Sequence, residues 1–359
     1  MLFTPYKLGS VELSNRLVMS PMTRNRAIGN VPNDLMAEYY SQRAEAGLII
    51  TEGTSPSPNG LGYARIPGVF SPEQTEAWKK VTDAVHAKGG RIFLQMMHTG
   101  RIGHPSNLPS GAELIGPSLV AAPGQMWTDQ DGPQDHPAPR AMEKADIEQT
   151  VEEFRKSALN AVAAGFDGVE LHGANGYLID QFLNPASNKR TDNFGGSPEN
   201  RNRFALLVAQ AVSGAIGKDR LGIRLSPYGV FNGMEQYPEI HAQYTALAAA
   251  LSAYAGYVHL VDHSAMGAPK PEKATVDAIR RAFTGTLILS GGYDLIRAEK
   301  DLEEKRGDLI AFGRPFLANP DFVQRLRSGD ALNEPDQSTF YTPGEKGYTD
   351  YPSLALSTP

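Results

Sequence analysis

Residues 145–172, ADIEQTVEEFRKSALNAVAAGFDGVELH, contain one complete helix-to-strand unit. The first part is amphipathic, with acidic residues in its first turn and a glycine at its end. Both features stand where the helix dipole and left-handed end geometry favour them. The apolar run GVELH from Gly168 then predicts a parallel strand covered by helices. The pattern recurs upstream, where SPEQTEAWKKVTDAVHAKG from Ser71 begins with a serine cap and a proline, ends on glycine and precedes another apolar run.

The alternation continues along nearly the whole chain. Eight strand candidates are LVMSPM from Leu17, LIITEG from Leu48, RIFLQMM from Arg91, GVELH from Gly168, LGIRLS from Leu221, YVHLVD from Tyr257, TLILSG from Thr286 and LIAFGR from Leu309. Because no linker or change in composition interrupts them, the pattern predicts one α/β domain, residues 1–359, folded as a (β/α)8 TIM barrel. A doubly wound sheet would use fewer strands per domain and show clearer seams.

Three segments exceed a minimal barrel. Residues 1–16 predict a short hairpin that plugs the bottom of the barrel. Residues 101–144 are a Gly/Pro-rich excursion after the third strand, and residues 184–201 form another insertion. Insertions that follow strands lie on the C-terminal face of such a barrel, where active sites are built.

Composition excludes several classes of protein. The chain has 359 residues and no cysteine, which excludes disulfides, thiolate-bound zinc, cysteine-ligated iron–sulfur clusters and a cysteine nucleophile. A net charge of -6 provides no broad cationic field for nucleic acid or anionic membranes. The N-terminal MLFTPYKLGSVELSNR lacks the pattern of a secretory signal, and no stretch reaches the roughly 18 apolar residues of a membrane span. We therefore expect a cytoplasmic protein.

Polar residues and glycines stand at the ends of several predicted strands and should converge on the mouth of the barrel. They include few carboxylates and many hydrogen-bond donors, which suits an anionic ligand with polar edges. They are Thr23, Gly53, Gln95, His98, His172, Asn175, Tyr177, Arg224, Gly291, Gly292, Gly313 and Arg314.

The loops after the last two strands predict a phosphate site. In barrels of this type these loops commonly hold phosphate with glycine N–H groups and a cation. SGGYD from Ser290 and FGRP from Phe312 supply the glycines, and Arg314 supplies the charge. The alternative is that the glycines only form tight turns and that Arg314 is a surface cation.

Arg224 lies between Ile223 and Leu225 in an apolar strand, where an unpaired guanidinium would be costly. Either it pairs with a neighbouring carboxylate such as Glu170 or Glu52, or it faces a carbonyl or developing anion on a cofactor.

The string HGANGYLIDQFLN from His172 carries the clearest chemistry. His172 and Asn175 can donate to one carbonyl or nitro oxygen, which polarises the attached C=C bond and stabilises the enolate formed when hydride adds at the β-carbon. Tyr177 can then protonate the α-carbon. The alternative is a buried histidine that caps a turn beside a core tyrosine.

Several motifs together resemble the Old Yellow Enzyme family over essentially the full chain. They are PMTRNRA from Pro21, TEGT from Thr51, QMMHTGR from Gln95, FDGVELHGANGYLIDQFLNPASNKRTDNFGGSPENRNRF from Phe166, GIRLSP from Gly222, FGRPFLANPD from Phe312 and GYTDYP from Gly347. The bacterial branch with pentaerythritol tetranitrate reductase, N-ethylmaleimide reductase and morphinone reductase is the most similar. The resemblance implies an ene-reductase that passes hydride from NADPH or NADH through FMN to activated alkenes such as enones, maleimides and nitroalkenes.

The resemblance also implies roles for individual residues. His172 and Asn175 would hold the substrate oxygen and Tyr177 would donate the proton. FMN would contact Pro21, Met22, Thr23, Gly53, Gln95, Arg224, Gly292, Gly313 and Arg314, while Tyr63, Met97 and Tyr341 would line the substrate cavity. Many relatives have tryptophan where this chain has Met97, so we expect a roomier pocket.

Two other classes remain open from the residues alone. A metal-dependent barrel hydrolase would use His98, His172 and Asp262 or His263, although the first strand ends in Met19, Pro21 and Met22 without a ligand. The other class is a non-catalytic FMN-binding protein. We expect no metal site, and a monomer or homodimer.

Overall fold

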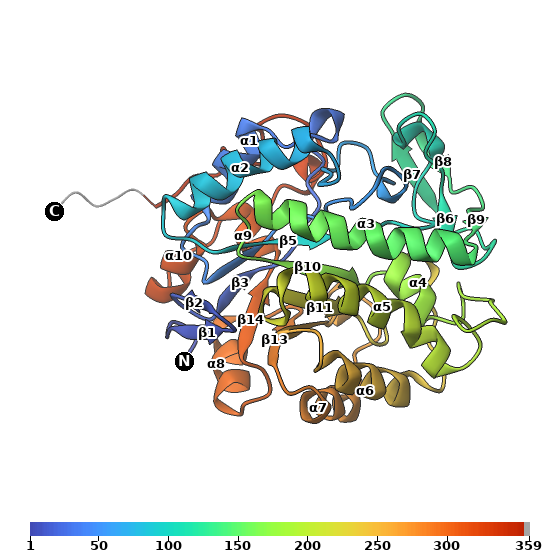
Figure 1. Ribbon diagram of the computed structural model, residues 1–359. Coiled ribbons are helices and arrows are strands. Elements are labelled where there is room, and N and C mark those ends of the chain that lie inside the picture. The colour runs from blue at the N-terminus through green and yellow to red at the C-terminus, as the bar shows by residue number, and fades with distance from the viewer. Residues whose placement is uncertain (355–359) are drawn as a thin grey trace.

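The computed structural model describes residues 1–354 and shows a closed barrel of eight parallel strands (Figure 1). Each strand pairs with its neighbour along the chain, and β14 closes the barrel against β3. The strands are β3 (Leu17–Met19), β4 (Leu48–Ile50), β5 (Ile92–Met96), β10 (Gly168–Gly173), β11 (Leu221–Leu225), β12 (Tyr257–Val261), β13 (Thr286–Ser290) and β14 (Leu309–Phe312). The predicted barrel and its eight strands are confirmed. The predicted extent of the domain, 1–359, includes residues 355–359, which lie outside the described residues.

Helices surround the barrel (Figure 1). They are α1 (Asp34–Gln42), α2 (Pro72–His86), α3 (Lys144–Ala163), α5 (Pro198–Ile216), α6 (Ile240–Leu251), α7 (Lys273–Ala282), α8 (Leu295–Glu303) and α10 (Phe322–Ser328), with the short α4 (Leu178–Leu183) and α9 (Arg314–Ala318). The predicted serine cap of α2 is confirmed, because Ser71 Oγ accepts from the Gln74 N–H at 3.1 Å. The glycine after α3 is Gly165, whose φ of 91° favours glycine.

The hairpin of β1 (Tyr6–Leu8) and β2 (Val11–Leu13) plugs the bottom of the barrel, as predicted. Leu8 and Leu13 pack in one buried cluster with side chains inside the barrel, among them Phe93, Tyr257 and Ile288. In Figure 1 this hairpin lies at the left, near α8. The apolar plug closes one end of the barrel, so polar chemistry is left to the opposite end.

The excursion after the third barrel strand builds two small sheets near the opposite end (Figure 1). In one of them β6 (Ile115–Gly116) pairs with β9 (Arg140–Ala141), and in the other β7 (Gln125–Thr128) pairs with β8 (Gly132–Asp135) in an antiparallel hairpin. The insertion expected over residues 184–201 is shorter than predicted. Helix α5 begins at Pro198, because Ser197 accepts from the Asn200 N–H and caps it.

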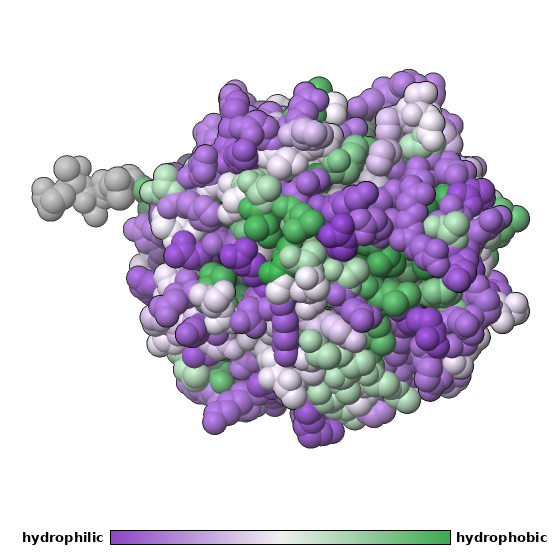
Figure 2. Space-filling model, in the orientation of Figure 1, coloured by the Kyte–Doolittle hydropathy of each residue, from purple (hydrophilic) through white to green (hydrophobic). Residues whose placement is uncertain are grey.

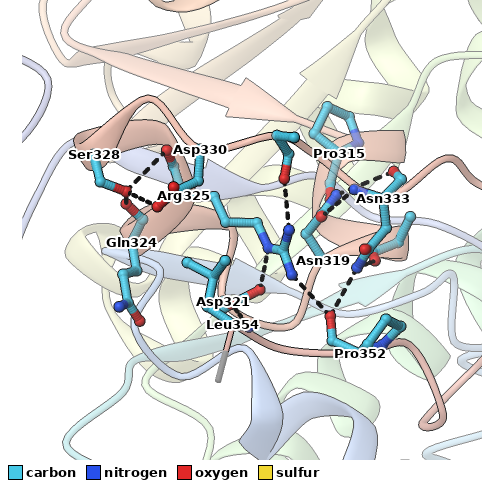
Figure 3. A network of polar contacts seen from close by, with 12 residues as sticks. Pro315, Asn319, Asp321, Gln324, Arg325, Ser328, Asp330, Asn333, Pro352 and Leu354 are labelled. Atoms are coloured by element: carbon cyan, nitrogen blue, oxygen red, sulfur yellow. Dashed lines mark hydrogen bonds and ion pairs between the residues drawn. The ribbon is translucent and has the colours of Figure 1, made fainter. Parts of the chain in front are cut away.

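Arginine donors hold the C-terminal segment in place. Arg325 on α10 donates to Asp321 at 2.8 Å and to the carbonyls of Ala331 and Pro352 (Figure 3). Arg24, Arg26 and Arg43 are buried and donate to carbonyl groups between residues 339 and 348. This clamp places residues 337–343 at the mouth of the barrel.

The face of the molecule drawn in Figure 2 is mostly hydrophilic, and its hydrophobic residues gather in small areas. Within residues 1–354, no helix has both the length and the apolar character needed to cross a membrane.

Candidate active site

Two adjoining cavities open at the C-terminal ends of the strands. The first, of about 810 Å³, is lined by these predicted residues: Pro21, Thr23, Gly53, Tyr63, Gln95, Met97, His172, Asn175, Tyr177, Arg224 and Tyr341. The second, of about 470 Å³, adds Met22, Gly291, Gly292, Gly313 and Arg314. Pro21, Thr23, Asn175, Arg224 and Tyr341 line both, so the two cavities form one continuous site. The structure thus brings together every residue that the sequence assigned to cofactor or substrate.

His98 is the exception among the polar residues at strand ends, because it lines neither cavity. It is buried, and its Nδ1 atom accepts from the Gly100 N–H at 3.1 Å. Burial lowers the pKa of His98 to about 3, so the ring is neutral. His98 therefore supports the loop after β5, and it does not line the site with the other polar residues as expected.

The second cavity has the chemistry of a phosphate site. Gly292 has a φ of 59°, which favours glycine, and a Cβ atom on Gly313 would meet nothing closer than Met22 Sδ at 3.7 Å. Arg314 reaches only the sulfur of Met266, at 3.7 Å, and within residues 1–354 it has no carboxylate within 4.0 Å. Open backbone and an uncompensated cation fit the phosphate of FMN.

Arg224 is buried at the junction of the cavities, and its Nε atom has no partner within the described part of the chain. The expected alternative of an ion pair with Glu170 or Glu52 is not found there within 4.0 Å. Glu170 instead accepts from Gln95 Nε2 at 2.8 Å and contacts His259 Nδ1 at 3.0 Å. A buried cation with an unused donor fits the polar edge of a flavin.

His172 is the last residue but one of β10 and is a neutral hydrogen-bond donor. Its Nδ1 atom accepts from the Ala174 N–H at 3.3 Å, which leaves the ring proton on Nε2. Burial, and next the positive charge of Arg224, hold the pKa of His172 well below its usual range.

Asn175 lies in a turn that fixes its backbone. Its φ is 59°, its N–H donates to Ser226 Oγ at 3.0 Å, and its carbonyl accepts from Asn232 Nδ2 at 2.8 Å. Asp180 accepts from the Gly176 N–H at 2.8 Å in the same turn. The turn thus holds Asn175 and Tyr177 at the cavity.

Tyr177 and Tyr63 both line the first cavity, and their hydroxyl oxygens lie 2.9 Å apart. The ring of Tyr177 also packs edge-on against His172, with centroids 4.8 Å apart. Burial raises the pKa of Tyr177, so its phenol stays protonated at neutral pH. Both tyrosines pack against a small buried cluster that contains Met97, whereas Tyr341 is 60% exposed.

The cavity also contains residues that the sequence did not single out. Arg65 forms an ion pair with Asp129 from the β7–β8 hairpin, and Met126 and Trp127 of that hairpin line the wall. His263, considered only as a metal ligand, contacts Asn175 instead. Nothing in their sequence pattern marks them, because segments far apart in the chain bring them to the site.

The closed barrel and the two joined cavities at its mouth fit a flavoprotein: hydrogen-bond donors line the first cavity, glycines and Arg314 line the second, and Arg224 lines both. The chain belongs to the NADH:flavin oxidoreductase / NADH oxidase family, whose profile matches residues 1–333. It is 42% identical to a probable flavin mononucleotide-dependent alkene reductase of Leishmania infantum, over 99% of this chain and 98% of that one. It is 41% identical to 12-oxophytodienoate reductase 7 of rice, over 98% and 94% of the two chains.

Solved structures agree. Morphinone reductase superposes with a TM-score of 0.94 at 44% identity, covering 98% of this chain and 96% of that chain. An Old Yellow Enzyme homologue from Zymomonas mobilis gives 0.93 at 39% identity, covering 98% and 99%. The predicted family, enzyme class and FMN cofactor are confirmed: the protein is an FMN-dependent oxidoreductase of the Old Yellow Enzyme type. The metal-dependent hydrolase and the non-catalytic FMN-binding protein are set aside.

Proposed function

We propose that this protein is an ene-reductase that uses NADPH or NADH to reduce α,β-unsaturated carbonyl and nitro compounds. The observation that carries the proposal is the arrangement of His172, Asn175 and Tyr177 on one wall of the first cavity. Two side chains there can donate to an oxygen, and the third can donate a proton to carbon. FMN held in the two cavities would supply the hydride chemistry between the nicotinamide and the β-carbon of the alkene.

The neutral His172 supplies Nε2–H and Asn175 supplies its side-chain amide to the substrate oxygen. Both donors are fixed before the substrate arrives, so they stabilise the negative charge that develops on that oxygen without reorganising. The same two donors suit the amide oxygen of a nicotinamide. One cavity can therefore receive the reductant and the alkene in turn, which predicts ping-pong kinetics.

Tyr177 is proposed to protonate the α-carbon. If the Tyr63 hydroxyl donates to the Tyr177 oxygen across their 2.9 Å contact, the Tyr177 proton is free to point into the cavity. After transfer, the same bond from Tyr63 stabilises the tyrosinate. The raised pKa of Tyr177 keeps this proton in place until a strongly basic enolate carbon is formed.

At the cofactor, Arg224 and Gln95 are proposed to bind the pyrimidine edge, while Gly292, Gly313 and Arg314 bind the phosphate. Pro21, Met22, Thr23 and Gly53 complete the walls. The fixed charge of Arg224 favours the more negative, reduced form of the ligand. Tyr63, Met97 and Tyr341 are proposed to shape the substrate side.

An anaerobic visible-absorption titration tests the proposal. NADPH or NADH should bleach a flavin band near roughly 460 nm, and 2-cyclohexenone should restore it. Tyr177→Phe should bleach normally but recover about 100-fold or more slowly, because only the proton donor is lost. Tyr348→Phe is the matched control, since the Tyr348 hydroxyl is buried, has no partner within residues 1–354 and lines neither cavity. A protein that cannot be loaded with FMN, or that 2-cyclohexenone does not reoxidise, would contradict the proposal.

A further inference from the structure

His263 makes a contact that none of the assigned roles uses. It follows β12, is half-buried and lines the second cavity, with its Nε2 atom 2.7 Å from Asn175 Oδ1. The ring of Phe231 packs edge-on against it at 4.6 Å between centroids. The imidazole is therefore held in place against the side-chain amide of Asn175.

The turn around Asn175 fixes its backbone but not the orientation of its side-chain amide. The backbone N–H and carbonyl of Asn175 are both bonded, to Ser226 and Asn232. An asparagine amide has nearly the same shape when its oxygen and nitrogen exchange places, so neighbouring donors and acceptors decide which atom faces where. His263 is the side chain that contacts this amide within the described part of the chain.

His263 is neutral and can donate one hydrogen bond to Asn175. Burial, and next the positive charge of Arg224, lower the pKa of His263 to about 4, against the opposing effect of Asp262. A neutral imidazole carries one N–H. Because Asn175 presents its oxygen to Nε2, that proton lies on Nε2.

We propose that His263 is a positioning residue for the substrate oxygen: its Nε2–H bond to Asn175 Oδ1 turns the amino group of Asn175 toward the cavity. There this group joins His172 as the second donor. Were the amide reversed, its oxygen would face the cavity and repel a carbonyl oxygen. This inference rests on the proposed function, since it gives Asn175 a substrate oxygen to bind.

Two variants of similar length separate the donor from the bulk of the side chain. His263→Gln keeps an N–H donor, whereas His263→Met removes it. The measurement is the Kd of 2-cyclohexenone for the oxidised, FMN-loaded protein, followed through the flavin spectrum. His263→Met should weaken binding about five- to tenfold, the usual effect of one lost hydrogen bond. The Kd of His263→Gln for 2-cyclohexenone should stay within about twofold of the wild-type value. Both variants are measured at saturating FMN, because His263 also lines the second cavity.

A double-mutant cycle shows whether His263 acts through Asn175. In an Asn175→Ala background, His263→Met should have no further effect on the Kd of the enone. The proposal would be overturned if His263→Met weakened enone binding equally in that background, or if His263→Gln bound the enone as weakly as His263→Met. Enone binding needs no turnover, so a protein that binds the enone without reducing it contradicts the proposed function alone.

A second measurement needs no ligand or activity. In protein with ¹⁵N-labelled histidine, the His263 ring should show a protonated Nε2 and an unprotonated Nδ1 at neutral pH. The His263→Gln spectrum assigns the signals. An unprotonated Nε2 would refute the proposal even in a protein that does not bind 2-cyclohexenone.

Discussion

Asp180→Asn should make the stability of the protein less sensitive to pH. Asp180 lies buried on α4, where its Oδ2 atom accepts from the Gly176 N–H and its Oδ1 atom accepts from the Tyr244 hydroxyl at 3.3 Å. Asparagine can keep this pattern, because its oxygen can accept from Gly176 while its amino group donates to the Tyr244 oxygen. The substitution therefore removes the ionisation and leaves the turn below Asn175 supported.

The magnitude follows from the pKa. Burial raises the pKa of Asp180 to about 7, against about 3.9 in an unfolded chain. Because the folded-state pKa is raised, the protonated carboxyl contributes stability that is complete below about pH 4 and is lost as pH rises through 7. Between pH 5 and 8 the loss amounts to about 2–3 kcal/mol. From pH 5 to pH 8, the free energy of unfolding of wild type should therefore fall by this amount relative to that of Asp180→Asn.

Urea unfolding at pH 5 and pH 8, with both proteins saturated with FMN, measures the difference. Glu52, whose pKa burial raises to about 7, titrates in both proteins, so its effect cancels. Asp131→Asn is the control, because Asp131 is exposed. Its free energy of unfolding should differ from that of wild type by the same amount at pH 5 and at pH 8. If the difference for Asp180→Asn were also the same at both pH values, Asp180 would not titrate in this range and the reasoning would be refuted.

Three further substitutions test the cavities and the C-terminal clamp. Met97→Trp should lower kcat/KM for a bulky 3-alkylcyclohexenone about tenfold more than for 2-cyclohexenone, because Met97 lines the substrate cavity; equal losses would contradict this. Arg314→Met should raise the Kd for FMN at least about tenfold but leave the Kd for riboflavin unchanged, since riboflavin lacks the phosphate. Fluorescence titration of the apoprotein measures both Kd values, and an equal rise for riboflavin would contradict the phosphate role. Arg43→Met removes donors to the carbonyls of Phe316, Leu317 and Tyr348. It should lower the free energy of unfolding in urea by about 2–4 kcal/mol, and unchanged stability would show that the bonds of Arg43 contribute little.

The barrel was predictable because its signals are local. Each strand is a short apolar run, and each long helix carries its own periodicity, cap and stop, as Ser71 and Gly165 show for α2 and α3. Boundaries in the insertion before α5 were less certain, because a loop has no periodicity and only the Ser197 cap marks where the helix starts.

The sequence by itself determined the order of the β/α units, the plugging hairpin and the set of residues at the strand ends, since in a closed parallel barrel every strand must end at one mouth. Only the tertiary structure decided which of those residues face a cavity. It buried His98 outside both cavities, left Arg224 without a carboxylate partner within residues 1–354, and brought His263 to Asn175. The contact of His263 with Asn175 joins positions 88 residues apart. It depends on the angle and depth at which whole segments pack, which no local pattern encodes.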